Sequence, residues 1–264
     1  MAGIVRESEK ESRRDHWETF WRDKEDVTQV YSNENRILRN LQNMGDLRGK
    51  KILEIGAGTG RDSFPLITHG ADVVQLDYAE NSLRILKRLA EDMQLPATIV
   101  GGDTFQLPFP DATFDVVFHQ GLLEHFRQPQ ADALLKENIR VLKQGGLLLV
   151  DVPQRYHLYT VIKHILMALN KWFAGWERSF SVPELKRRMQ ALGLTPVYSY
   201  GEWMYPSIFY RSFREALKTI GLTLPLNPRP IKSIAHLRTG VRMALLRTPL
   251  PLYTGFNIGV VGRK

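Results

Sequence analysis

The sequence predicts an α/β fold, a Rossmann-like and mostly parallel sheet of seven strands with helices on both faces, N-terminal helices and helical lid insertions. Two observations support this. Short apolar runs alternate with helical patterns between residues 50 and 153, which is typical of parallel strands covered on both faces. A turn with three glycines follows the first run, at the kind of strand end where open α/β sheets bind ligands.

The predicted strands are short apolar runs bounded by glycine, proline or acidic residues. They cover residues 50–56, 72–78, 97–103, 114–120, 145–153, 194–201 and 254–264. Between them, residues 80–93 and 130–143 carry large apolar residues at helical spacing. The segment 181–193 begins with serine, has proline in its first turn and ends on glycine, so it has helix start and stop signals.

The first 45 residues have the periodicity of helices. Trp17, Phe20 and Trp21 stand at positions i, i+3 and i+4, and this spacing puts them on one helical face. The pattern returns further on, at Ile37, Leu38, Leu41 and Met44.

The chain divides into a core interrupted by two insertions. In order, it comprises an N-terminal helical cap (1–45), a ligand-binding core (46–153), a helical insertion (154–181), a core helix and strand (182–201), a basic and aromatic helical insertion (202–253) and a terminal core strand (254–264). Each insertion leaves the carboxyl end of a predicted strand, so both are expected on the ligand side, where they can form a lid.

Composition narrows the function classes. The chain of 264 residues has no cysteine, which excludes disulfides, thiolate metal sites and cysteine nucleophiles. No signal peptide or membrane-spanning run is expected, which predicts a cytoplasmic protein. The net charge is +8, and residues 203–253 hold most of the excess, with Glu215 as their only acid. This excess indicates either an anionic partner or a solvated basic face.

The glycine turn reads "LEIGAGTG", with Glu54 two residues before Gly56. Dinucleotide-binding turns space their glycines as G-x-G-x-x-G, whereas here the third glycine comes one residue earlier. The glycine turn is not followed directly by a lysine and a serine or threonine, as a P-loop requires. A nicotinamide dehydrogenase and a triphosphate site are therefore disfavoured.

Two further strand ends carry acids. Asp77 ends the second predicted strand, where a carboxylate can accept hydrogen bonds from a ribose diol. Asp103 ends the third, where it can accept a hydrogen bond from an adenine amine. Alternatively, each acid only caps the turn that follows it. Three coordinated strand ends favour the ligand site.

These motifs, in the order "LEIGAGTG", "LDYAENSL", "GDTFQLPFPDATFDVVF", "LLEHF" and "VLKQGGLLLVDVP", resemble class I S-adenosylmethionine-dependent methyltransferases, within them the small-molecule and quinone-type branch (type 11-like). The resemblance covers residues 45–153 and the terminal strand. It implies that S-adenosylmethionine is the cofactor. It assigns the methionine and ribose portion to Glu54, Gly56, Ala57, Gly58 and Gly60, the ribose hydroxyls to Asp77, the adenine to Tyr78, Asp103 and Thr104, and the methionine end to Gln120 and Gly121.

The segment "FHQGLLEHF" bears on the acceptor. It lacks the Asn/Asp-Pro-Pro-aromatic motif of nucleic-acid amino-methyltransferases, which disfavours nucleic-acid bases as acceptors. A base is needed only for a weakly acidic acceptor, and His125 and His119 are available for it. His125 is alternatively a structural histidine of the cleft, and Glu124 is interpreted as a helix-terminus residue. No spacing of histidines and acids indicates a metal site.

Both insertions contain amphipathic helix candidates. Residues 158–173 place an apolar face with tryptophan opposite Lys163 and His164, and residues 207–220 set phenylalanines against basic residues. Such helices suit the surface of an anionic membrane, although most pack on a core instead. Residues 231–247 show no clean face.

The sequence thus predicts a methyltransferase that acts on a small or lipid-linked acceptor, more readily at oxygen than at carbon or nitrogen, with peripheral membrane contact. Two alternatives remain open. A methyltransferase for RNA or another polyanion would use the basic tail differently. A non-catalytic scaffold subunit would bind the cofactor without turnover.

Overall fold

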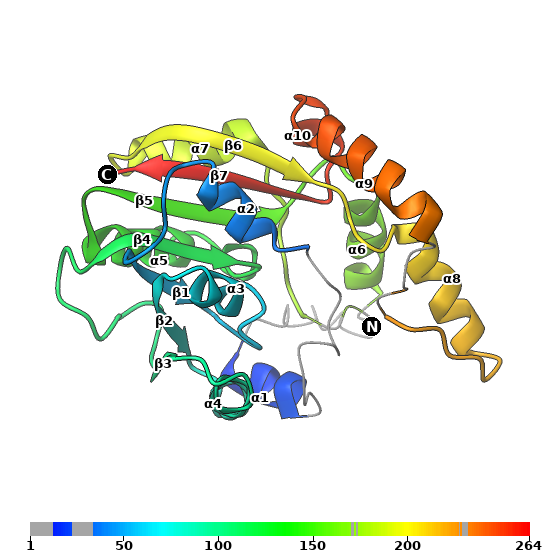
Figure 1. Ribbon diagram of the computed structural model, residues 1–264, viewed down its shortest axis with the longest axis horizontal. Coiled ribbons are helices and arrows are strands. Elements are labelled where there is room, and N and C mark those ends of the chain that lie inside the picture. Colours follow the sequence, from blue (N-terminus) through cyan, green and yellow to red (C-terminus); the bar gives the residue numbers. More distant parts are fainter. Residues whose placement is uncertain (1–12, 23–33, 170–171, 173, 227, 229–231) are drawn as a thin grey trace, which may run out of the picture.

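The computed structural model describes residues 13–22, 34–169, 172, 174–226, 228 and 232–264. Its strands form one seven-stranded sheet in the order β3-β2-β1-β4-β5-β7-β6 (Figure 1). They are β1 (Lys51–Ile55), β2 (Asp72–Asp77), β3 (Thr98–Gly101), β4 (Phe114–Gln120), β5 (Leu142–Pro153), β6 (Thr195–Glu202) and β7 (Asn257–Arg263). Only β7 runs antiparallel to its neighbours, β5 and β6. The predicted α/β fold with a mostly parallel sheet is confirmed.

Helices cover both faces of the sheet because each buries an apolar stripe against it. On one face lie α2 (Arg36–Gln42), α3 (Ser63–Thr68) and α4 (Glu80–Asp92), which share a buried cluster with the strands. On the other face lie α5 (Gln130–Val141) and α7 (Val182–Ala191), which share a second cluster. The remaining helices are α1 (Arg14–Arg22), the 3₁₀ turn η2 (Leu123–His125), α6 (Leu158–Ala168), α8 (Ile208–Lys218), α9 (Lys232–Leu246) and α10 (Leu250–Thr254).

The predicted helical region of residues 1–45 is confirmed in part. Within its described residues, helix extends over α1 and α2, and residues 43–45 lie beyond the end of α2. Residues 1–12 and 23–33 of that prediction lie outside the described residues. Most other bounds differ from the prediction by one to three residues, as at β5, which begins at residue 142 rather than 145. The largest difference is at α6, which ends at residue 168 rather than 173.

The strand order creates a binding crevice. β1 is an inner strand, paired in parallel with β2 on one side and with β4 on the other. The chain therefore leaves β1 toward one half of the sheet and later returns to build the other half. In open α/β sheets the crevice at this reversal, outside the carboxyl ends of the strands, is the usual ligand site.

A buried ion pair ties α2 to the sheet. The guanidinium of Arg36 donates two hydrogen bonds to Asp151 of β5, at 2.8 and 2.9 Å. Tyr200 of β6 and Asn257 of β7 donate to the same carboxylate. Because every partner is buried, this cluster fixes one helix and three strands in a single arrangement.

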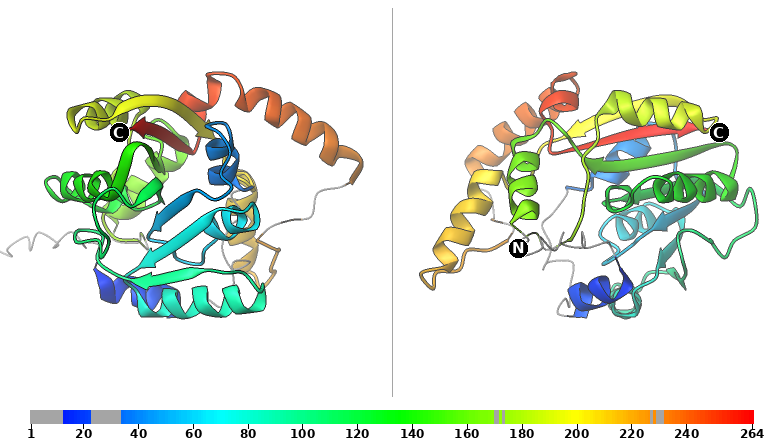
Figure 2. Two further views of the ribbon diagram at one scale, coloured as in Figure 1. Left: turned by 60° about the vertical axis from the view of Figure 1, so that its left-hand side comes forward. Right: turned by 180° about the vertical axis from the view of Figure 1, so that it is seen from behind.

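The insertions lie beyond the carboxyl ends of the parallel strands. Figures 1 and 2 show α6, α8 and α9 together at this end of the molecule, outside the two helical layers. Among the described residues no helix combines the length and apolar character needed to cross a membrane.

Candidate functional site

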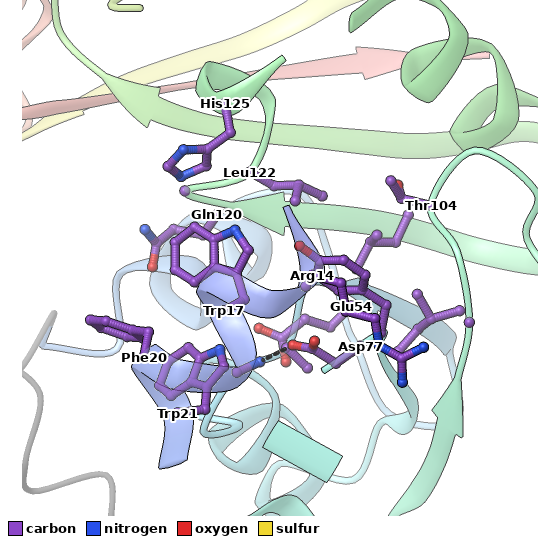
Figure 3. Close-up of a pocket in the computed structure, with 18 of the residues that line it drawn as sticks. Arg14, Trp17, Phe20, Trp21, Glu54, Asp77, Thr104, Gln120, Leu122 and His125 are labelled. Carbon is purple, nitrogen blue, oxygen red and sulfur yellow. Dashed lines mark hydrogen bonds between the residues drawn. The ribbon is translucent and has the colours of Figure 1, made fainter. Parts of the chain in front are cut away.

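A cavity of about 840 Å³ opens at the carboxyl ends of β1, β2, β3 and β4 (Figure 3). Nearly all the residues predicted to bind the cofactor line it: Glu54, Gly56, Ala57, Gly58, Asp77, Tyr78, Asp103, Thr104, Gln120 and Gly121. His125 lines it as well. The chain thus brings together side chains and backbone from four strand ends that are far apart in sequence.

Gly60 is the exception, because it is not among the lining residues. Its φ is 70°, and a Cβ there would come within 2.5 Å of the Phe64 ring and 2.8 Å of the Gln75 side chain. The lack of a side chain at the third glycine therefore allows the close packing of α3 on the sheet.

The first two glycines form the turn that faces the cavity. Gly56 and Gly58 have φ values of 70° and 57°, which residues with a Cβ rarely adopt. The N–H of Gly58 donates to Oδ2 of Asp77 at 2.9 Å, which joins the turn after β1 to the end of β2. The glycine loop and the second acid are therefore one hydrogen-bonded unit.

Asp77 is buried, and its other oxygen, Oδ1, accepts from the N–H of Ala79 at 2.9 Å. Burial raises the pKa of its carboxyl above the ordinary 3.8, although the backbone N–H groups of Ala79 and Gly58 oppose that rise. Asp103 also lines the cavity, and its Oδ1 accepts from the N–H of Phe105 at 2.9 Å. Both acids thus do cap the turns that follow them, while they also face the cavity.

A buried carboxyl oxygen of Glu54 indicates whether S-adenosylmethionine fits the cavity. Its side chain is buried at the end of β1, and Oε2 has no hydrogen-bond partner among the described residues. Burial raises the pKa of its carboxyl well above the ordinary 4.5, and the nearby Asp62 raises it further. A buried acceptor without a donor is costly. The ammonium group in the methionine portion of S-adenosylmethionine is such a donor, so the residues fit this group.

Helix α1 forms the outer wall of the cavity. Arg14, Trp17, Phe20 and Trp21 all line it (Figure 3). The aromatic rings meet edge to face, Trp17 with Phe20 at 5.5 Å and Phe20 with Trp21 at 4.8 Å between centroids. Sequence reasoning placed these rings on one helical face without assigning them to the site; that shared face was the signal available.

Glu18 fixes α1 in this place. Its carboxylate accepts from the first N–H groups of α4, Glu80 N at 2.6 Å and Asn81 N at 3.0 Å. The side chain of Asn81 donates in return to the Glu18 carbonyl at 2.9 Å. A carboxylate at the amino end of a helix satisfies free N–H groups and interacts favourably with the helix dipole.

His125 lines the cavity from η2, and its ring packs edge to face against Trp17 of α1 at 5.1 Å (Figure 3). Its Nδ1 is 4.0 Å from Oε1 of Glu177, which comes from the 154–181 insertion and also lines the cavity. Burial lowers the pKa of His125 below 6.5, while the Glu177 carboxylate opposes that shift. Ala174 lines the cavity too, whereas no described residue of 202–253 does.

His119 is not a candidate base. It lies in β4, it is fully buried and outside the cavity, and neither ring nitrogen has a hydrogen-bond partner among the described residues. Burial lowers its pKa to about 3. Alternate residues of a strand face opposite sides of the sheet. The side chain of residue 119 faces one of these covered sides rather than the cavity.

The comparisons with known proteins agree with this geometry. A family model described as "Methyltransferase domain" matches residues 52–146. A ubiquinone biosynthesis O-methyltransferase of Coxiella burnetii is 31% identical over 162 residues, 60% of this chain and 68% of that protein. A demethylmenaquinone methyltransferase of Renibacterium salmoninarum is 36% identical over 107 residues, 40% of this chain. The match spans only 43% of that relative's own length.

Solved structures share the fold. A S-adenosylmethionine-dependent methyltransferase of Thermotoga maritima superimposes with a TM-score of 0.62 at 19% identity, covering 96% of this chain and all of that one. The magnesium protoporphyrin IX methyltransferase of Synechocystis, solved with bound S-adenosylhomocysteine, has a TM-score of 0.54 at 18% identity over 70% of this chain and 85% of that one. The chain belongs to the class I S-adenosylmethionine-dependent methyltransferases.

Proposed function

We propose that this protein transfers the methyl group of S-adenosylmethionine to an oxygen atom of a small, apolar, lipid-linked acceptor of the quinone type. The observation that carries the proposal is the shape of the cavity. Its floor is the hydrogen-bonded unit of Gly58 and Asp77, and its far side is an aromatic wall with His125 beside Trp17.

The two parts of the cavity suit two different ligands. When bound, the cofactor supplies a methyl group that is already electrophilic, so the protein needs mainly to position the acceptor and exclude water. Asp77, Tyr78 and Asp103 would hold the nucleoside portion, and Glu54 would accept from the methionine ammonium. Indole and phenyl rings would pack against a flat aromatic acceptor. The relatives named for quinone and ubiquinone methylation support this class of acceptor.

The orientation of α6 supports contact with a membrane surface. Lys163, which lies on the helix face opposite the apolar residues, is completely buried. The apolar residues of the same helix point outward instead, with Val161 and Ile165 each 55% exposed. A helix on a water-facing surface normally has the opposite arrangement, so an apolar environment would suit this outer face.

Helix α8 supports the same proposal. Phe209 is 80% exposed and Phe213 is also exposed, and both lie on a helix that carries the basic residues Arg211, Arg214 and Lys218. Exposed aromatic side chains beside cationic ones are the pattern of helices that lie in the surface of an anionic bilayer. We therefore propose that α6 and α8 touch the membrane from which a lipid-linked acceptor enters.

The test is incubation of the protein with methyl-labelled S-adenosylmethionine and a membrane-containing cell extract, followed by solvent partition. Base-stable label in the organic phase that depends on the protein supports the proposal. Label confined to small aqueous molecules would remove the lipid-linked acceptor, and label in RNA would favour the polyanion alternative. Binding of the cofactor without any transfer would favour a scaffold subunit.

A further inference from the structure

A buried cluster of charged residues lies directly behind the acceptor side of the cavity. It contains Glu124 and His125 of η2, Lys163 of α6 and Glu177 of the same insertion as α6. Lys163 is fully buried, and the other three are nearly so. Charged side chains are rarely buried without a partner, so the arrangement within this cluster needs a physical reason.

We propose that Glu177 is the positioning residue of His125. It would hold the imidazole in one tautomer and stabilise the imidazolium that forms when His125 removes a proton from the acceptor, with Lys163 keeping Glu177 in place. The inference rests on the proposed function, because it concerns the proton that an acceptor hydroxyl loses on methylation.

The side chains of Glu177 and His125 face each other. Oε1 of Glu177 faces Nδ1 of His125 at 4.0 Å, and Nδ1 is buried with no hydrogen-bond partner among the described residues. Nδ1 is thus the ring nitrogen beside Glu177, and we assign Nε2 to the acceptor, because His125 also lines the cavity. The separation exceeds a hydrogen bond, and such contacts tighten in catalytic complexes.

Lys163 holds the other oxygen of the same carboxylate. Its ammonium donates to Oε2 of Glu177 at 3.0 Å and to the carbonyl of Arg178 at 3.3 Å. The backbone N–H of Arg178 in turn donates to the Glu124 carbonyl at 2.9 Å, which ties the insertion to η2. Oε2 is therefore engaged by lysine, and Oε1 is left for His125.

The cluster has two carboxyl groups and one lysine. Burial raises the pKa of Glu124 well above its ordinary 4.5, and the nearby Glu177 carboxylate raises it further. The raised pKa disfavours the charged form of Glu124, and the ammonium of Lys163 is hydrogen-bonded to Glu177. Glu177 is also the carboxylate that faces His125, and an acid in this place favours an imidazolium.

The chemistry balances with the proton on His125. The acceptor oxygen forms a bond to the methyl carbon as the carbon–sulfur bond breaks, and the sulfur keeps the electron pair of that bond. The acceptor proton goes to Nε2 of His125, and Glu177 offsets the positive charge on the ring until the proton reaches solvent. The carboxylate that orients histidine in serine hydrolases has this same role toward its imidazole.

Several groups other than Glu177 bear on the titration of His125. Burial lowers its pKa most, Lys163 and His16 of α1 lower it as well, and a backbone contact with Gly121 raises it. Among these groups, Glu177 is the acid that raises it. Removing this one charge should therefore lower the pKa of His125 further, whereas a purely structural substitution should not.

The test is an NMR titration of the His125 ring in the full chain saturated with S-adenosylhomocysteine. The signal is assigned by its loss in His125→Gln. In Glu177→Gln the pKa of His125 should fall, and in Glu177→Asp, which keeps the charge, it should lie closer to the parent value. Glu184→Gln is the matched control, because Glu184 pairs with Arg155 and Arg178 rather than with His125.

An unchanged titration of His125 in Glu177→Gln would overturn the inference, as would an equal fall in Glu184→Gln. If Glu177→Gln does not fold, Glu177→Asp is compared with the parent, since a longer charge separation should still lower the pKa. This readout requires no turnover. Failure of the labelled transfer with an intact titration shift would thus count against the proposed function, and the reverse would count against the role of Glu177.

Discussion

The indole of Trp21 lies over Gly58, so closely that a Cβ on Gly58 would come within 2.7 Å of Cζ2 of that ring. The packing of the protein itself therefore requires glycine at this position in the loop after β1. Because Trp21 belongs to α1, the outer wall of the cavity and its floor are in direct contact.

Gly58→Ala should weaken S-adenosylmethionine binding about tenfold or more, because the left-handed backbone alone costs ~1–2 kcal/mol with a Cβ and the clash with Trp21 adds to it. Isothermal calorimetry measures the loss. In the double variant Gly58→Ala with Trp21→Ala, part of the affinity should return. If Gly58→Ala lowers the affinity by the same factor with Trp21 and with Trp21→Ala, the contact between residues 21 and 58 does not affect binding.

Asp77→Ala should reduce affinity for S-adenosylmethionine by roughly tenfold or more, since hydrogen bonds to a charged carboxylate are worth about 1.5–3 kcal/mol. Asp72→Ala at the exposed start of the same strand is the matched control and should bind normally. The raised pKa of Asp77 also predicts that affinity declines in acid from a pH above 3.8, as the acceptor becomes protonated. Unaltered binding by Asp77→Ala would refute the cofactor assignment.

Removal of the Glu18 carboxylate should detach α1 from α4. Burial raises the pKa of Glu18, but the N–H groups of Glu80 and Asn81 and the charge of Arg14 together lower it below 4.5. A lowered folded-state pKa means that this contribution to stability is present above pH 4.5 and is lost as the pH falls through the lowered value.

Glu18→Ala should therefore bind S-adenosylmethionine more weakly at pH 7 and show increased amide exchange in α1. The exposed neighbour Glu80, whose side chain only pairs with Arg84, is the control position. If Glu80→Ala and Glu18→Ala behave alike, the docking of α1 does not depend on this carboxylate.

Arg36→Met should lower the free energy of unfolding by about 3–5 kcal/mol, because it leaves the buried Asp151 carboxylate without its guanidinium. Denaturant unfolding measures this cost. Arg48→Met, which breaks the exposed pair of Arg48 with Asp46, serves as the control and should leave the midpoint in place. Comparable midpoints for the two variants would contradict a structural role for the buried cluster.

Membrane contact should depend on the exposed phenylalanines of α8. The parent protein should sediment with vesicles that contain anionic lipid, and less so as salt screens the basic residues. Phe209→Ser with Phe213→Ser should abolish most of this binding, whereas Met93→Ser, an exposed apolar position just after α4, should not change it. Sedimentation that changes neither with salt nor with substitution of the phenylalanines would argue against the proposed membrane surface.

The core of the fold was accessible from the sequence because its signals are local. Apolar strands, helical periodicity and the glycine turn each occupy a few consecutive residues, and the parallel sheet follows from their alternation. The same locality explains why residues at four strand ends were expected at one crevice, and they do line one cavity. The packing of Gly60 against Gln75 was not predicted, because these residues become neighbours only after the chain folds.

The orientation of α6 could not be predicted in this way. Periodicity identifies the two faces of a helix but not which face is buried, and the usual rule assigns the apolar face to the interior. In α6 the face with Lys163 is buried, because the ammonium of Lys163 pairs with the carboxylate of Glu177 in the segment that follows the helix. The role of α1 was missed for a similar reason, since Glu18 and the amino end of α4 are distant in sequence.

The position of β7 between β5 and β6 also constrains the order in which the molecule can be assembled on the ribosome. The five strands up to β5 can pair as soon as that strand emerges, because each has a neighbour already synthesised. β6 must wait, since β7, the strand to which it is hydrogen-bonded, is translated after both insertions. The cofactor half of the nascent chain can therefore be folded while α6 and α8 still lack a completed sheet beside them. During that interval their apolar faces would be available to chaperones or to a membrane.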